Sequence, residues 1–251
     1  MPIAKTEFTT RFFTEAGISP GMRVLDVGCG SGDLSFFIAS LVGQEGAVVG
    51  VDRDLSALSM PRQSAPAEHV QPPSFIQSDL MSLSPDLGQF DAIVGRRVLM
   101  YQPDTVAAVR ALSNFLKPGG LAVFQEHDST LVPVSLGAFP LHRQAQAWIK
   151  EMLVLERADL HIGLHLQKIL SAAGLYVDVV KAECLLQLPD QPNSLGDIIK
   201  ACLPRIINLG IASAEAVDMP TLQDRLNSER AQSDDIYISD IIFGARARKP
   251  F

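Results

Sequence analysis

The sequence is poor in cysteine and lacks long hydrophobic runs. Its three cysteines, Cys29, Cys184 and Cys202, are far apart, and none belongs to a CxxC pair. An odd number of scattered thiols forms neither a disulfide framework nor a structural zinc site, and it fits a reducing compartment. The chain also lacks a run of about 18 apolar residues and a basic start followed by an apolar segment. We therefore expect a soluble, cytoplasmic protein without a membrane span.

Basic residues are fewer than acidic ones. The 251 residues include 21 Lys and Arg against 28 Asp and Glu, which gives a net charge of −7, and no basic block interrupts the chain. An acidic chain of this kind has no general attraction for nucleic acid. Its 47% hydrophobic residues suffice for a sizeable core, so extended disorder is excluded and a single α/β domain over residues 1–251 is expected.

Short apolar runs alternate with amphipathic segments between residues 21 and 127. Strands are expected at 24–27, 47–51, 75–76, 90–94 and 121–124. Helices are expected at 34–42, from about Leu55, and from Pro103 to Leu116, where Lys117-Pro118-Gly119-Gly120 stops the last one. This alternation predicts a doubly wound parallel sheet with helices on both faces, whose ligand binds at the carboxyl ends of the strands.

The alternation is lost after residue 127. Helices are expected at 141–152 and 162–173, a strand at 175–184, mostly helix at 189–232 and a last strand at 236–247. The segments 128–160 and 189–232 are insertions that either form a lid or only pack against the sheet. Residues 1–20 have a short helical pattern, and its apolar side chains either cover the ligand or join two copies of the chain: Phe8, Phe12 and Phe13.

A glycine-rich loop follows the first expected strand. Gly28, Gly30 and Gly32 allow a sharp turn and let a ligand approach without meeting a Cβ atom. A dinucleotide-binding fingerprint needs another glycine at position 33. That residue is Asp33, and its carboxylate opposes a pyrophosphate at the helix N-terminus. The GxGxG spacing thus argues against a nicotinamide-dependent oxidoreductase, which is kept as an alternative.

Three acidic residues lie at the ends of the first three expected strands. Asp26 lies near the end of a buried strand and needs a donor, either an ammonium group or backbone amides, to offset its desolvation. Asp52 is placed to accept both hydroxyls of a ribose. Asp79 either lies near an adenine amino group or caps a helix.

Five segments in unbroken order resemble the class I S-adenosylmethionine-dependent methyltransferases. They are VLDVGCGSGDLSFFIA, the acidic end of VVGVDRD, QSDL at 77–80, FDAIVGRRVL at 90–99 and LKPGG at 116–120. The resemblance implies a Rossmann-like, seven-stranded, mostly parallel sheet with an antiparallel last strand. It also implies a set of residues that bind S-adenosylmethionine: Asp26, Gly28, Gly30 and Gly32 at the methionine moiety, Asp52 with Arg53 at the ribose, Asp79 and Leu80 at the adenine, and Arg96 and Arg97 near the sulfonium and carboxylate.

Arg96 and Arg97 depart from the commonest pattern of this family, which has small or uncharged residues after the fourth strand. One of them forms a bidentate bond to the methionine carboxylate or to an anionic substrate. In the alternative, one arginine is solvated and the other pairs with a neighbouring acid.

Glu126 and His127, at the end of the fifth expected strand, are the candidate catalytic residues. Methyl transfer needs alignment of the reacting groups and exclusion of water, and it needs a base only where the acceptor loses a proton. The resemblance favours Glu126 as a wall of the acceptor pocket and His127 as the base, unless His127 is purely structural. His161 and His165 have a metal-binding spacing without a third ligand, so no metal is expected.

The expected acceptor is a small, rather hydrophobic molecule. The segment 95–98 lacks the Asn/Asp-Pro-Pro-aromatic sequence that grips an amide or an adenine amine. Four side chains either line the acceptor pocket or belong to the core: Phe12, His142, Trp148 and Met152. We interpret the chain as a secondary-metabolite or quinone-like O-, N- or C-methyltransferase. The alternative is a cyclase-like or regulatory protein that binds S-adenosylmethionine and methylates nothing.

Overall fold

The computed structural model describes residues 7–55, 70–131, 133–189 and 194–251. Within them, seven strands form one sheet in the order β3-β2-β1-β4-β5-β7-β6. Strands β1 to β5 pair in parallel, and β7 runs antiparallel between β5 and β6. The strands are β1 (Arg23–Val27), β2 (Ala47–Asp52), β3 (Ser74–Gln77), β4 (Phe90–Arg96), β5 (Leu116–Asp128), β6 (Tyr176–Gln187) and β7 (Tyr237–Arg248). The expected Rossmann-like sheet is therefore confirmed.

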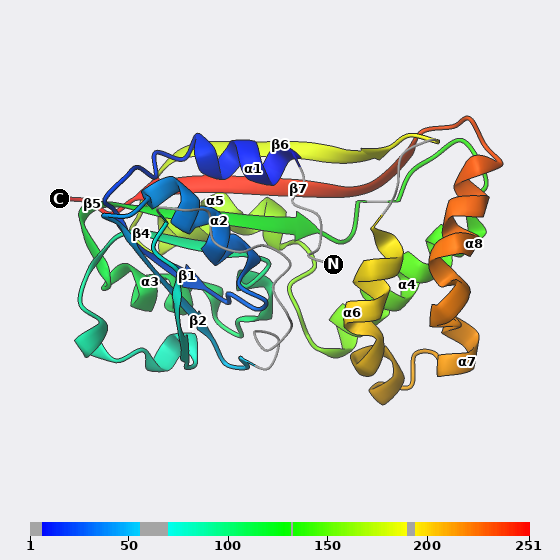
Figure 1. Ribbon diagram of the computed structural model, residues 1–251, viewed down its shortest axis with the longest axis horizontal. Helices are drawn as coiled ribbons and strands as arrows, with labels where there is room; N and C mark the ends of the chain where they lie inside the picture. The colour runs from blue at the N-terminus through cyan, green and yellow to red at the C-terminus, as the bar shows by residue number, and fades with distance from the viewer. Residues whose placement is uncertain (1–6, 56–69, 132, 190–193) are drawn as a thin grey trace.

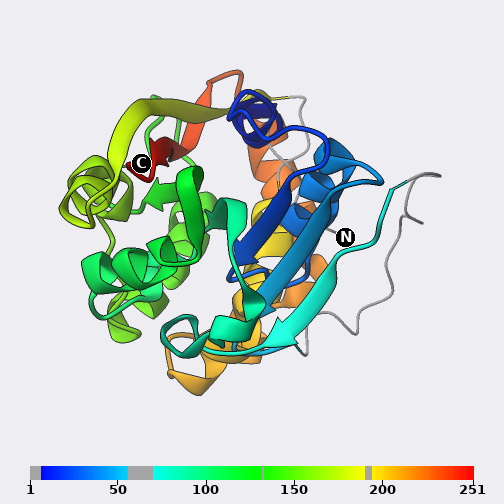
Figure 2. The ribbon, with the colours of Figure 1, turned by 90° about the vertical axis from the view of Figure 1, so that its left-hand side faces the viewer.

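Helices cover both faces of the sheet (Figure 2). The helices α1 (Glu7–Thr14) and α2 (Asp33–Val42) pack with Val24 and Val123 on one face. The helices α3 (Thr105–Ser113) and α5 (Ile162–Ala172) pack with Leu25 and Phe124 on the other. Successive side chains of a strand point to opposite faces of the sheet. The core residues of β1, β4 and β5 therefore identify the face on which each other side chain of these strands lies.

Strand β5 begins earlier than expected. The predicted helix 103–116 ends at Ser113, and Lys117-Pro118-Gly119-Gly120 lies within β5 instead of stopping a helix. The cause is tertiary pairing, because Leu116 pairs with Phe90, Lys117 Nζ lies 2.6 Å from Asp91 Oδ1, and the Gly119 amide donates to the Lys249 carbonyl. The helix expected from Leu55 falls outside the described residues.

Four helices gather beyond the end of the sheet toward which β5 points, at the right of Figure 1. They are α4 (Pro140–Leu155), α6 (Leu195–Asn208), α7 (Ala214–Val217) and α8 (Met219–Ala231), and we call them the helical cap. Their apolar side chains share one core with α3 and α5. In the part of the chain that is described, no helix combines the length and apolar character that crossing a membrane requires.

Among the described residues, three short 3₁₀ helices lie in the loops around β4. They are η2 (Leu80–Ser82), η3 (Pro85–Leu87) and η4 (Leu99–Tyr101). The last of these follows β4 directly, so it lies between the sheet and the helical cap. Arg205 of α6 reaches it, with its guanidinium 5.6 Å from the centre of the Tyr101 ring, and also forms an ion pair with Glu156 at the end of α4.

Candidate functional site

The glycine loop joins β1 to α2 in a left-handed backbone conformation. Gly28, Gly30 and Gly32 have φ values of 67°, 50° and 82°. A Cβ atom at Gly28 would lie 2.3 Å from the Val98 side chain, so packing alone requires glycine there. A Cβ atom at Gly30 would meet nothing within 4 Å. The backbone at Gly30 therefore borders open space in which a ligand can approach it.

Asp26 is a buried carboxylate with one oxygen unused. Its side chain is on the α2 face of β1, the residue is 1% exposed, and Oδ2 accepts a hydrogen bond from the Ser35 hydroxyl. Oδ1 has no hydrogen-bond partner among the described residues. Burial raises the pKa of Asp26 to about 7, although the Ser35 hydrogen bond opposes the shift. An unpaired acceptor beside the glycine loop fits a bound ammonium group.

The raised pKa of Asp26 predicts that stability depends on pH. We expect the unfolding free energy of the ligand-free protein to fall as the pH rises from about 4 to about 7, because the protonated carboxyl is favoured by folding in that range. Asp26→Asn should remove part of this decrease in the unfolding free energy, at most about 4 kcal/mol. Urea unfolding at several pH values measures it.

Glu126 serves as the matched comparison, because burial also raises its pKa to about 7. Glu126→Gln should flatten a further part of the same slope. Identical pH slopes for wild type and Asp26→Asn would show that Asp26 ionises normally in the folded protein.

Asp52 is tied to the glycine loop by backbone hydrogen bonds. Its Oδ2 accepts from the Gly30 amide at 2.9 Å, and its Oδ1 accepts from the Asp54 amide at 3.0 Å. Each carboxylate oxygen keeps a further lone pair for a ligand hydroxyl. The adjacent Arg53 is exposed, and its carbonyl accepts from the Gln77 side chain at 3.0 Å. The structure thus places Asp52 beside Gly30, as a ribose contact requires.

Asp79 caps a short helix. Its Oδ1 accepts from the Met81 amide at 2.8 Å at the start of η2, and its side chain is exposed, whereas Leu80 is buried. The capping alternative is therefore what the structure shows for this carboxylate. Contact of Asp79 or Leu80 with an adenine ring stays a prediction.

Arg96 and Arg97 are half-buried at the carboxyl end of β4. Burial and then the neighbouring Arg97 lower the pKa of Arg96, whereas Asp26 and Asp33 oppose this change. Arg97 has a φ of 57°, and its amide donates to the Gln125 carbonyl at 2.9 Å. Among the described residues, neither guanidinium has an ion-pair partner. The alternative in which one arginine pairs with a neighbouring acid is therefore not seen.

Glu126 supports the loop that follows β4. The residue is 0% exposed, and its Oε1 accepts from the Val98 and Leu99 amides at 2.9 and 2.8 Å. Its Oε2 is buried, and no residue in the described part of the chain forms a hydrogen bond with it. Strand alternation puts the side chain on the same face as Phe124, toward α3 and α5. Glu126 thus holds the backbone of the loop after β4 through the Val98 and Leu99 amides.

His127 lies on the opposite face from Glu126. Its Nδ1 is hydrogen-bonded to Asp240 Oδ2 on β7, and its side chain is 13% exposed. A carboxylate only accepts, so Nδ1 carries the hydrogen and Nε2 of the neutral ring has the free lone pair. Asp240 was not found from the sequence, because nothing local marks a partner 113 residues away.

The four predicted acceptor contacts are core side chains in this structure. Phe12 is buried between Phe8 and β7, where a Cβ at Gly244 would lie 2.7 Å from its ring. His142 is fully buried, with Nδ1 2.7 Å from Glu229 Oε2 of α8. Trp148 and Met152 are buried in the core of the cap. Their burial fits the core alternative, and contact with an acceptor stays a prediction.

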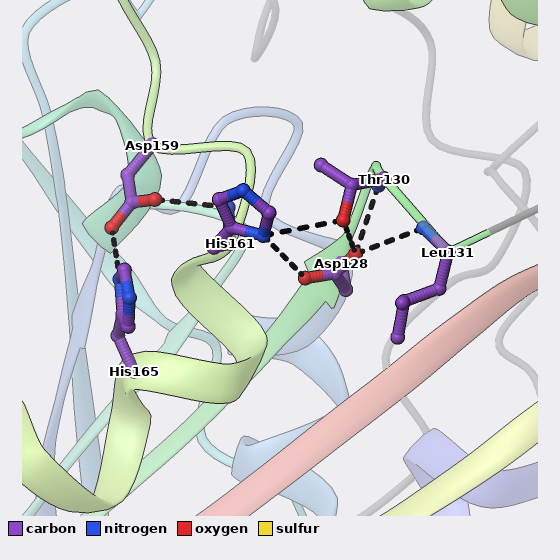
Figure 3. Close-up of polar contacts among 6 residues, drawn as sticks. All are labelled: Asp128, Thr130, Leu131, Asp159, His161 and His165. Carbon is purple, nitrogen blue, oxygen red and sulfur yellow. Dashed lines mark hydrogen bonds and ion pairs between the residues drawn. The ribbon is translucent and has the colours of Figure 1, made fainter.

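The imidazoles of His161 and His165 lie near different carboxylates, and His161 Nδ1 is also 3.2 Å from the Thr130 hydroxyl (Figure 3). His161 Nδ1 lies 3.5 Å from Asp128 Oδ2, and His165 Nδ1 lies 2.8 Å from Asp159 Oδ2. Asp128 Oδ1 also accepts from the Thr130 amide at 2.8 Å, which closes the turn after β5. Among the residues that are described, no group of three or more His, Cys, Asp and Glu is arranged to hold a metal ion.

Comparison with known proteins agrees with this geometry. A family model described as a methyltransferase domain matches residues 18–174. Demethylmenaquinone methyltransferase of Lactococcus lactis subsp. lactis is 30% identical over 122 residues, which are 49% of this chain and 48% of that protein. The chain thus spans about half the length of the curated relatives it matches.

Two solved structures are similar over 96% of this chain. One is a Bacillus halodurans C-125 protein provisionally named a methyltransferase, with a TM-score of 0.59, 15% identity and 98% of that chain covered. The other is Haemonchus contortus phosphoethanolamine N-methyltransferase 2 in complex with S-adenosyl-L-methionine, with a TM-score of 0.55, 20% identity and 52% of that chain covered. The likeness to these two structures shows the fold. Because the family model covers more than half of the sequence, including the glycine loop and β5, the chain belongs to the class I S-adenosylmethionine-dependent methyltransferase family.

Proposed function

We propose that this chain binds S-adenosylmethionine and methylates a small, apolar, quinone-like acceptor. The observation that carries the proposal is the buried, unpaired Oδ1 of Asp26 beside the open face of Gly30. An amino-acid ligand matches this pair of features, because its ammonium group would donate to the carboxylate while its chain lies against the glycine backbone. The relatives named demethylmenaquinone methyltransferases support a quinone-like acceptor.

The residues around the glycine loop fit this methyl donor. Asp26 would bind the ammonium group and Asp52 the ribose hydroxyls, with Arg53 at the rim. Asp79 and Leu80 would adjoin the adenine, and Arg96 the carboxylate. When bound, S-adenosylmethionine supplies a methyl group activated by the sulfonium. The chain's own contribution is then to align the acceptor and to exclude water.

His127 would take the proton that a hydroxylated acceptor loses. Asp240 holds the imidazole through Nδ1, which leaves Nε2 available as the base. Glu126 would act indirectly, because its hydrogen bonds to Val98 and Leu99 hold the loop between the sheet and the cap. The cap helices would exclude water from the carboxyl edge of the sheet, which is the lid alternative for segments 128–160 and 189–232.

Calorimetry with S-adenosylhomocysteine tests the proposal. Because an ammonium group beside Asp26 would lower the pKa of that carboxyl from about 7, binding near pH 6.5 should release protons and the measured heat should depend on the buffer. Asp26→Asn should abolish this dependence and weaken binding by roughly 10- to 100-fold, the effect of losing a hydrogen bond to a charged group.

Glu126→Gln is the control, since that carboxyl also has a pKa raised to about 7 but points to the other face of the sheet. It should leave proton release unchanged. Heat with NADH and none with S-adenosylhomocysteine would contradict the proposal and favour the oxidoreductase alternative.

A further inference from the structure

The two consecutive arginines at the end of β4 have different surroundings. Val94 belongs to the core under α1 and α2, so Arg96, two residues later, points to the face that carries Asp26. The charges that act on Arg96 agree with this placement, since Asp26 and Asp33 are the acids that raise its pKa against the effect of burial. Arg96 therefore belongs to the glycine-loop side of the site.

Arg97, directly after β4, has a left-handed backbone conformation. Its φ of 57° is uncommon for a residue with a side chain and persists only where the surroundings impose it. Here the Arg97 amide is bound to the Gln125 carbonyl, and the next two amides are bound to Glu126 Oε1. Three backbone hydrogen bonds thus hold this arginine in place.

The groups around Arg97 come from the sheet edge and from the cap. Its charge opposes the effect of burial on the pKa of both Glu126 and Cys202 of α6, so it lies near both. The other arginine that acts on Cys202 is Arg205, and it is already paired with Glu156. The charge of Arg97 therefore lies between Glu126 of β5 and Cys202 of α6.

Arg97 is a half-buried cation without a bound anion. Glu126 uses Oε1 for two backbone amides, and its Oε2 accepts no hydrogen bond from Arg97 or from any other described residue. A ligand with an anionic oxygen would supply the hydrogen-bond acceptor that this guanidinium lacks.

We propose that Arg97 faces the methyl acceptor and pairs with its anionic oxygen, a phenolate or an enolate, whereas Arg96 serves the methyl-donor side. This inference rests on the proposed function and assigns it an ionisable acceptor. It assigns one role to each arginine, whereas the sequence did not distinguish which of them binds the methionine carboxylate and which an anionic substrate. Arg97 would then hold the acceptor oxygen that is already ionised, and the proton of a second acceptor hydroxyl would go to Nε2 of His127.

The test uses protein saturated with S-adenosylhomocysteine and two probes of similar shape, 4-nitrophenol and 4-nitroanisole. Only the first can ionise, and its absorption spectrum reports whether the bound form is the phenolate. We expect wild type to bind 4-nitrophenol at least about tenfold more tightly than 4-nitroanisole, and as the phenolate, at a pH where free 4-nitrophenol is partly neutral. Arg97→Met should remove that preference and keep the affinity for S-adenosylhomocysteine.

Two further variants guard against a general disturbance of the loop. Arg97→Lys retains the charge and should restore part of the preference for 4-nitrophenol. Arg96→Met should weaken the binding of S-adenosylhomocysteine. At a saturating concentration of S-adenosylhomocysteine, this variant should keep the preference for 4-nitrophenol. All variants are compared below their unfolding temperatures.

Each outcome separates the two proposals. If S-adenosylhomocysteine does not bind wild type, the proposed function fails and this inference fails with it. If it binds but wild type shows no preference for 4-nitrophenol, or if Arg97→Met keeps that preference, only the role of Arg97 is overturned. The role of Arg97 is also overturned if Arg97→Met weakens the binding of S-adenosylhomocysteine and Arg96→Met does not.

Discussion

Replacement of Gly30 by valine is expected to weaken S-adenosylhomocysteine binding by about 100-fold or more. A Cβ atom at this position projects into open space next to the backbone amide that binds Asp52, so the added side chain would occupy the place proposed for the methionine moiety. A 100-fold loss corresponds to about 2.7 kcal/mol, which is modest for a ligand displaced from its backbone contacts. Isothermal titration calorimetry measures the affinity directly.

Gly210→Val is the matched control. Gly210 also has a positive φ, 70°, and a Cβ atom there likewise meets nothing within 4 Å, but the residue lies between α6 and α7 in the helical cap. Both substitutions should cost stability, because a left-handed conformation disfavours a branched side chain by about 1–2 kcal/mol. Only Gly30→Val should lose affinity. Wild-type affinity in folded Gly30→Val protein would mean that the ligand does not lie against this loop.

Replacement of His127 by alanine is expected to slow methyl transfer to a hydroquinone by roughly 10²–10⁴-fold. The assay uses labelled S-adenosylmethionine and the reduced form of 1,4-naphthoquinone, whose hydroxyl must lose a proton. Affinity for S-adenosylhomocysteine should change little. An acceptor without a proton to lose should be almost insensitive to the substitution.

Asp240→Asn tests whether the carboxylate positions the imidazole. It keeps the shape of the side chain but also allows the opposite tautomer, so we expect a rate loss of about tenfold or more with a changed pH profile. His165→Ala is the control, since His165 is likewise hydrogen-bonded to an aspartate but lies exposed on α5. It should change the rate by less than about threefold. A loss that small in His127→Ala would make His127 a bystander.

The core of the fold was predictable because its signals are local. The alternation of apolar runs and amphipathic helices located β1, β2, β4 and α2 to within a residue or two. The GxGxG spacing identified a loop whose glycines all have positive φ, because a sharp strand-to-helix turn requires residues without a Cβ atom. The order of five short motifs then indicated the family, which the family model confirms.

The boundaries and the face of each residue depended on pairing between distant segments. Lys117-Pro118-Gly119-Gly120 has the composition of a helix stop, yet it extends β5 because Asp91 and the Lys249 carbonyl bind it. Glu126 and His127 are neighbours in sequence, but strand alternation separates them onto opposite faces.

The sequence by itself determined the type and order of the strands, the glycine loop and the family, because these rest on residue types within short windows of chain. Only the tertiary structure decided that Asp240 holds His127, that one oxygen of Asp26 is unpaired among the described residues and that Arg97 adopts a left-handed conformation. Those facts depend on the register of strands and on burial, and both arise when segments more than a hundred residues apart pack together.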